Sequence, residues 1–186
     1  MSNIVWLVFS SLIYTISLSF IYFSKTRLNN GENKIYKYIL ITNIIGLILQ
    51  IFCDFVSYRH DVTPAIISDL VLRLYLLYFI IFISLLIFYL IEISFKHKKI
   101  ANIITIIFDI LLTIIIFILP YNLYRDVTHR IYYTYGTAVQ TTFYLSGILS
   151  IIIFVILIVK RKNPGLKKKV IPIWIYLLFG LVIMAI

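Results

Sequence analysis

Residues Ile66–Phe95 read IISDLVLRLYLLYFIIFISLLIFYLIEISF, and the middle of this stretch is apolar on every face. A helix that crosses the hydrocarbon core of a bilayer needs roughly 20 mostly apolar residues, each rising about 1.5 Å. The stretch is longer than that minimum, which fits a tilted helix or one that extends beyond the bilayer. Because a helix on the surface of a soluble protein keeps a polar face, this segment predicts a membrane-spanning helix.

Five other stretches have the same character. The sequence predicts spanning helices over residues 4–23, 38–56, 66–95, 100–119, 136–159 and 170–186. Every proline lies between two of these helices or in a first turn, where the missing N–H costs little. The four are Pro64, Pro120, Pro164 and Pro172. We therefore predict an all-α, polytopic membrane helix bundle in which residues 1–186 form one transmembrane domain of six helices without a soluble domain.

The composition points to the same class. The chain is 62% hydrophobic and 13% charged, whereas soluble domains are about 45–50% apolar and about 25% charged. Lipid must therefore solvate much of the surface. A net charge of +10 would suit a nucleic-acid partner, but the cations lie in short breaks between apolar runs, so we expect none. The lone cysteine, Cys53, can form neither an intrachain disulfide nor a cysteine-based metal site.

The distribution of cations predicts the orientation. Most of the seventeen lysines and arginines lie in residues 24–37, 96–99 and 160–169. The alternate loops hold only Arg59, Arg125 and Arg130. Cytoplasmic loops of membrane proteins carry an excess of lysine and arginine. We therefore predict a multi-pass cell-membrane protein with the N-terminus outside and the three lysine-rich loops in the cytoplasm.

The last predicted helix has an unusual end. Six crossings from an outside N-terminus would leave Ile186 outside, in a helix without the charged or aromatic anchor that usually marks the interface. We expect a seventh helix to follow and to return the chain to the cytoplasm, where an effector domain could begin.

Catalytic motifs are missing from the sequence. It contains no glycine-rich phosphate loop, no nucleophile elbow and no zinc-binding signature, and its three histidines lie in three different loops. The sequence therefore predicts no catalytic residue, no cofactor and no metal site within the chain. An enzymatic role is left open only for a domain that would follow it.

One carboxylate lies near the middle of a predicted helix. A charged Asp109 would be costly there, so it should be protonated, paired or turned toward a wet interior. Asp109 could sense a proton or cation, or belong to a transport path. Alternatively, it could form a hydrogen bond with a neighbouring helix, with Asn43, Gln50 or Thr113 as candidate partners.

Two pairs of opposite charges stand at helical spacing. Asp69 and Arg73 are four residues apart, so they share a helix face near the outer end of their helix and should form an ion pair. Asp54 is expected at a similar depth and could share Arg73. Glu92 and Lys96 repeat the spacing at the cytoplasmic end, where lysine can extend to the headgroups.

The outer loop before residue 136 combines tyrosines with Arg125, His129 and Arg130. Aromatic belts at membrane interfaces explain tyrosines without any ligand, but arginine beside tyrosine would also suit an anionic or amphipathic ligand. His129 could add pH dependence. The resulting hypothesis is an outer sensory pocket for an extracellular or membrane ligand. Its candidate residues are Asp54, Asp69, Arg73, Arg125, His129 and Arg130.

Several stretches resemble the N-terminal membrane region of Firmicute sensor histidine kinases and diguanylate cyclases of the seven-helix type. They are Ile41–Asp54 (ITNIIGLILQIFCD), Leu74–Ile93 (LYLLYFIIFISLLIFYLIEI), Ile131–Val139 (IYYTYGTAV) and Lys168–Gly180 (KKVIPIWIYLLFG). The resemblance implies a homodimeric sensory module of a bacterial signal-transduction protein, such as a two-component system, that relays a cue to a cytoplasmic effector. No kinase or cyclase motif occurs in this chain.

Two other functions remain open. Asn43, Gln50 and Asp109 could mark the polar path of a small-solute or ion transporter, although the matching Gly/Pro interruptions of many transporters are missing. A small membrane subunit that acts as a scaffold is the third possibility. The coding sequence beyond Ile186 would discriminate, since a kinase or cyclase domain there favours sensing.

Overall fold

The computed structural model describes residues 3–26, 30–59, 63–95, 98–126 and 131–160. These residues form five long helices and one two-stranded hairpin. The helices are α1 (Asn3–Ser24), α2 (Gly31–Tyr58), α3 (Ala65–Ser94), α4 (Lys98–Ile118) and α5 (Thr137–Val159), and the strands are β1 (Asn122–Asp126) and β2 (Ile131–Tyr135). All five helices are long and apolar enough to cross a membrane. The chain is a multi-span membrane protein, and the prediction of a helical membrane bundle is confirmed.

The sequence predicts six spanning helices, and the described residues support five of them. The sixth predicted helix, 170–186, lies outside the described residues. The second helix also begins at Gly31 rather than at residue 38. Its polar first turns are stabilised by the side chain of Asn30, which accepts a hydrogen bond from the Asn33 N–H at 2.9 Å, and by Glu32 near the positive end of the helix. The hydropathy pattern alone does not reveal this extension.

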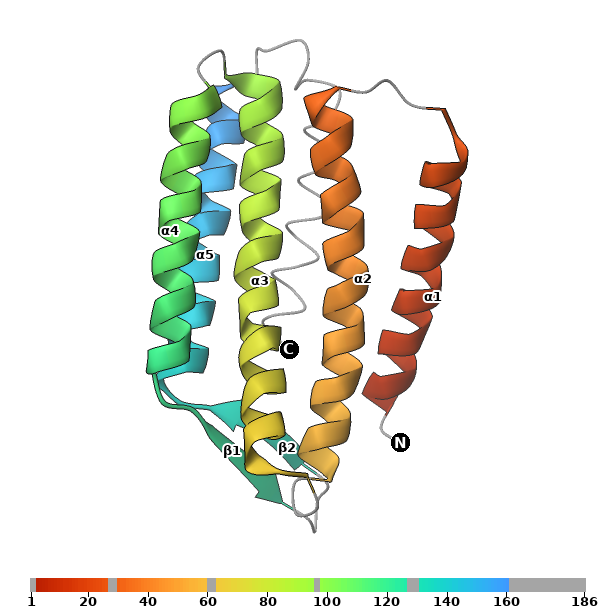
Figure 1. The fold of residues 1–186 in the computed structure, drawn as a ribbon, viewed down its shortest axis with the longest axis vertical. Coiled ribbons are helices and arrows are strands. Elements are labelled where there is room, and N and C mark those ends of the chain that lie inside the picture. Colours follow the sequence, from red (N-terminus) through yellow and green to blue (C-terminus); the bar gives the residue numbers. More distant parts are fainter. Residues whose placement is uncertain (1–2, 27–29, 60–62, 96–97, 127–130, 161–186) are drawn as a thin grey trace.

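The helices lie side by side with their axes roughly aligned, and α3 packs against α2, α4 and α5 (Figure 1). Helix α1 packs mainly against α2, at the edge of the bundle. One end of the bundle carries β1, β2 and the start of α1, and we call it the hairpin end. The opposite end, which we call the lysine end, carries the described lysines Lys25, Lys34, Lys37, Lys98, Lys99 and Lys160.

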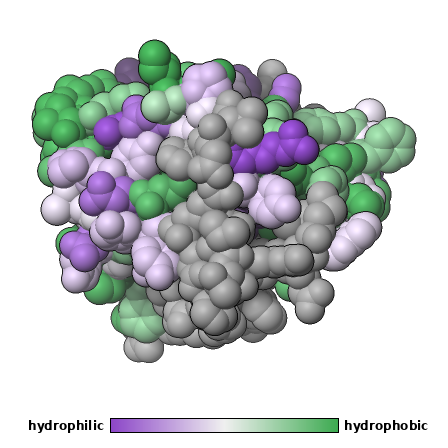
Figure 2. Space-filling model, turned by 90° about the horizontal axis from the view of Figure 1, so that it is seen from below, coloured by the Kyte–Doolittle hydropathy of each residue, from purple (hydrophilic) through white to green (hydrophobic). Residues whose placement is uncertain are grey.

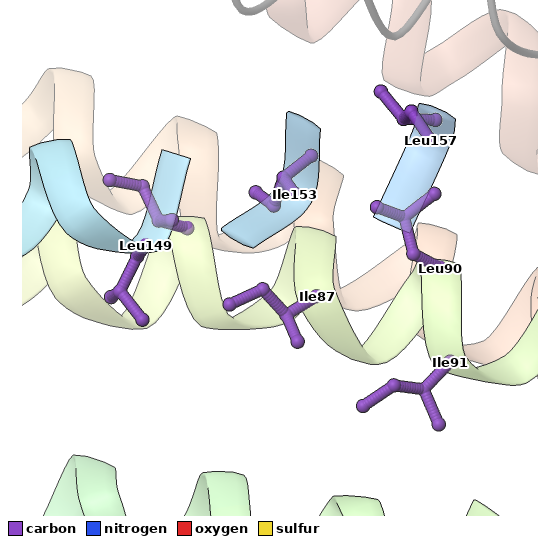
Figure 3. Packing of buried hydrophobic residues seen from close by; sticks show 7 residues of the cluster. Ile87, Leu90, Ile91, Leu149, Ile153 and Leu157 are labelled. Carbon is purple, nitrogen blue, oxygen red and sulfur yellow. The ribbon is translucent and has the colours of Figure 1, made fainter. Parts of the chain in front are cut away.

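Two apolar clusters form the core around α3. The cluster toward the lysine end joins Ile87 and Leu90 of α3 to Leu149, Ile153 and Leu157 of α5 (Figure 3). The cluster toward the hairpin end joins Leu76, Leu77 and Ile80 of α3, Leu112 and Ile116 of α4, and Ala138 and Val139 of α5. Most other large apolar side chains of α4 are exposed to the surroundings of the bundle. They suit contact with lipid.

The segment between α4 and α5 was expected as a loop, but it contains an antiparallel hairpin. Tyr124 pairs with Tyr133, and their rings stack with centroids 4.8 Å apart. Cross-strand aromatic pairs of this kind stabilise short hairpins. The hairpin leads into α5 through Gly136, whose φ of 120° is rarely accessible to other residues. The carbonyl of Pro120 accepts from the Ala138 N–H at 3.1 Å, which joins the two ends of the connection.

Candidate functional site along helices α3 and α4

Few side chains of helix α4 are buried in the bundle. Leu112 and Ile116 are its only buried residues within the part of the chain described. In a bilayer, lipid solvates an apolar face about as well as another helix does, so packing and polar contacts decide which helices stay together. The polar contacts between α3 and α4 occur at three levels, namely the hairpin end, the middle and the lysine end.

The contact at the hairpin end is made by Arg73. Its Nε donates to both carboxylate oxygens of Asp69, at 2.9 and 3.1 Å, so the ion pair expected from the sequence is present. Its Nη1 donates to the backbone carbonyls of Ile116 (2.5 Å), Phe117 (3.0 Å) and Leu119 (3.1 Å). The last carbonyls of a helix lack partners within it and carry partial negative charge. Arg73 therefore caps the C-terminus of α4 from the neighbouring helix.

Aromatic rings surround this guanidinium group. The rings of Tyr121 and Phe117 lie 5.1 and 6.0 Å from it, within cation–π range. The Tyr121 side chain also makes a hydrogen bond with Asp69. Burial, and after it this hydrogen bond, raise the pKa of Tyr121 to about 12, so its phenol stays protonated at neutral pH. The sequence suggested the Asp69–Arg73 pair, but neither the cap on α4 nor the role of Tyr121.

The contact in the middle is made by Asp109. Its Oδ1 accepts a hydrogen bond from the Ser84 hydroxyl of α3 at 2.6 Å. Ser84 is only 1% exposed. The sequence suggested Asn43, Gln50 or Thr113 as partners, but Thr113 donates instead to the backbone carbonyl of Asp109, at 2.8 Å. A lone serine among apolar residues gave no sequence signal for this pairing.

The contact at the lysine end is made by Glu92. Its Oε1 lies 2.7 Å from Nζ of Lys98, at the start of α4. The partner suggested by spacing, Lys96, lies outside the described residues. Glu92 also lies against the first residue of α2, since a Cβ added to Gly31 would overlap its carboxylate. A carboxylate in this position complements the positive end of α2. Glu92 thus connects α3 to both neighbours.

The remaining predicted intramembrane residues lie at a different interface. Asn43 of α2 accepts a hydrogen bond from the Tyr78 hydroxyl of α3 at 3.1 Å. Gln50, also on α2, is partly buried. Asp109 faces α3 from α4 instead. The described contacts therefore place Asn43 and Asp109 in two separate interfaces, with α3 between them.

The residues of the suggested outer pocket are only partly brought together. Asp69 and Arg73 are in contact, but the hydrogen bonds of Arg73 within the described structure go to Asp69 and α4 rather than to Asp54. Asp54 lies on α2, and its Oδ2 is buried without a hydrogen-bond partner among the described residues. Arg125 pairs with Tyr132 in the hairpin register, while His129 and Arg130 lie outside the described residues.

Viewed along the bundle axis, the hairpin end has hydrophilic residues gathered over part of its face and hydrophobic residues at its rim (Figure 2). Within the described ranges, no group of three or more His, Cys, Asp and Glu side chains is placed to hold a metal ion.

Comparison with known proteins gives no family assignment: no protein-family model, no curated protein and no solved structure matches this chain.

Proposed function

We propose that this chain is the membrane-embedded sensory module of a bacterial signal-transduction protein, which relays an external or membrane cue to a cytoplasmic histidine kinase or diguanylate cyclase domain. The observation that carries the proposal is the attachment of α4 to α3 by three polar contacts. The resemblance of the sequence to the sensor family named above also supports it. Because members of that family act as dimers, we also propose a homodimer.

A sensor needs two arrangements of its helices that bind the stimulus with different affinity. Arg73 offers a means of switching because one guanidinium group holds both Asp69 and the end of α4. An anionic group that competes for Arg73 would release the carbonyls of α4. With few buried apolar residues to hold it, α4 would then move relative to α3.

We further propose that the lysine end faces the cytoplasm and the hairpin end the exterior. The concentration of described lysines at one end of the bundle supports this orientation. The single cysteine makes a direct test possible. In a Cys53→Ser background, Asn122→Cys should react with a membrane-impermeant maleimide on intact cells, and Lys25→Cys only after permeabilisation. Both positions are exposed, and the reverse labelling pattern would overturn the orientation.

The transport alternative is supported by Asp109 alone. Its proposed companions on the path, Asn43 and Gln50, lie on α2, and the described contact of Asn43 is with Tyr78 rather than with the α3–α4 interface. A polar path through the bundle would have to pass around α3. We therefore favour sensing over transport.

The test of sensing uses the whole gene product that carries this chain, reconstituted in lipid nanodiscs, with autophosphorylation or cyclic-dinucleotide synthesis as the readout. Arg73→Gln should change the basal output several-fold, and Arg125→Ala should weaken the response to the native stimulus. Arg59→Gln is the matched control, since Arg59 lies at the same end and contacts the Phe55 ring of its own helix. Unchanged output in both variants, or the lack of any such output, would overturn the proposal.

A further inference from the structure

Three lysines lie where α1 ends near the start of α2, at the lysine end (Figure 1). Lys25 follows the last residue of α1. Lys34 and Lys37 are three residues apart on α2, so they share one face of this helix. All three residues are exposed, and within the described ranges none of them forms an ion pair. We call these three lysines the basic corner.

Acidic residues that could neutralise the basic corner are scarce in the chain. The three lysine-rich loops of the sequence contain Glu32 as their single acidic residue. Glu32 accepts a hydrogen bond from the Tyr89 hydroxyl of α3 at 3.0 Å. Glu92, near the end of α3, pairs with Lys98. The positive charge of the basic corner therefore suits an anionic partner from outside the chain.

Contacts between α1 and α2 bring the members of the basic corner to one surface. The amine of Lys37 lies 5.9 Å from the centroid of the Phe23 ring of α1, within cation–π range. Lys25 follows Phe23 by two residues. The Tyr22 hydroxyl of α1 donates a hydrogen bond to the Asn33 carbonyl of α2 at 3.0 Å, which fixes the end of α1 to the first turns of α2. Lysines from both helices therefore belong to the same site.

Helix α2 is long enough to carry its lysines to the level of the lipid headgroups. It has 28 residues, and roughly 20 residues cross the hydrocarbon core, so about eight remain for the headgroup region. Lys34 and Lys37 lie within the first seven residues of α2, and a lysine amine reaches the headgroups while its stem lies along apolar surface. On α1, Phe20 and Phe23 are 74% and 49% exposed. They offer apolar surface to acyl chains beside the same lysines.

We propose that the basic corner binds the phosphate group of an anionic phospholipid, while Phe20 and Phe23 contact the acyl chains of the same lipid. Lysines clustered next to the end of a membrane helix attract anionic lipids, and each lysine contributes roughly fivefold to the affinity. A soluble anion would meet the same charges but would leave the apolar contacts unused. The inference does not rest on the proposed sensory function, since lipid binding is measured without any output domain.

The test is native mass spectrometry of the full chain in detergent, titrated with phosphatidylglycerol or with phosphatidylcholine of the same acyl chains. The natural chain should retain several times more phosphatidylglycerol than phosphatidylcholine at equal concentration. Lys37→Gln should lower this preference about fivefold, and Lys37→Arg should keep it because arginine carries the same charge. If Lys37→Gln fails to fold, Lys25→Gln gives the same test, since Lys25 lies beyond the end of α1.

Two control variants separate the basic corner from a general attraction by positive charge. Lys99→Gln removes an exposed lysine from the same end, on α4, which packs mainly against α3 and α5. Arg59→Gln removes a cation that also lies over an aromatic ring, at the hairpin end. Both variants should keep the preference for phosphatidylglycerol. An equal loss in a control and in Lys37→Gln, equal retention of the two lipids by the natural chain, or displacement of the bound lipid by an equal concentration of glycerol phosphate would overturn the proposal.

Discussion

The interfaces that α3 forms with α2 and with α4 differ in how their contacts are made. Toward α2, the surfaces interlock by shape, since Gly46 leaves room for the ring of Tyr78. The hydroxyls of Tyr78 and Tyr89 also donate hydrogen bonds to Asn43 and Glu32 of α2. Toward α4, attachment depends on polar groups at three levels. A shape-matched interface has one favoured arrangement, whereas a polar contact can be exchanged for water, a ligand or a proton. The difference suggests that α2 and α3 form the fixed part of the bundle and α4 the adjustable part.

The largest effect should come from disturbing the shape-matched interface. A Cβ at Gly46 would overlap the ring of Tyr78, so Gly46→Ala should lower the free energy of unfolding by about 2–3 kcal/mol through overpacking. Unfolding in a detergent titration measures this. Gly147→Ala is a matched control in a neighbouring helix, since a Cβ there meets nothing within 4 Å. Equal stability of the two variants would contradict the close fit of Gly46 and Tyr78.

Breaking the cap on α4 should have the next largest effect. Arg73→Gln removes the charge that Asp69 and three backbone carbonyls share, and we expect a loss of about 1.5–2 kcal/mol because Asp69, the ion-pair partner, is half exposed. Amide hydrogen exchange should become faster in the last turn of α4 and in the residues that directly follow this helix. Exchange within α2 should not change. Faster exchange throughout the bundle would show that Arg73 stabilises the whole fold rather than α4.

The sequence predicts the spanning helices much better than it predicts their contacts. Hydrophobic length is a local property, so α3 and α5 can be recognised from residues 66–95 and 136–159 alone. The pair Asp69 and Arg73 is also local, since four residues separate its members. The capping of α4 by Arg73 and the bond from Ser84 to Asp109 link residues 43 and 25 positions apart. Such contacts depend on which helices are neighbours, and apolar periodicity carries little information about that in a membrane protein.

Removing the hydrogen bond between Ser84 and Asp109, in the middle of the α3–α4 interface, should lower the stability less than the changes above. Hydrogen bonds between membrane helices contribute on average about 0.6 kcal/mol, so Ser84→Ala should destabilise the protein by less than about 1 kcal/mol. Thr113→Ala is the control, because its hydroxyl donates to the backbone of its own helix, at the Asp109 carbonyl. A detergent titration of both variants measures the difference. If the two variants lose equal stability, the contact between Ser84 and Asp109 does not hold α4.

The smallest effect concerns Tyr121 and is largest at alkaline pH. Its pKa rises from the ordinary value of 10.0 to about 12 on folding. A raised pKa means that the folded state favours the protonated phenol, so the associated stability is complete below pH 10 and is lost as the pH rises toward 12. Tyr121→Phe lacks the ionisable group and should lose less stability than the natural protein between these two pH values. Its hydroxyl contact with Asp69 is also removed, so the variant should be slightly less stable at neutral pH. Alkaline unfolding curves that stay parallel for the two proteins would mean that Tyr121 is solvated as freely in the folded protein as in the unfolded chain.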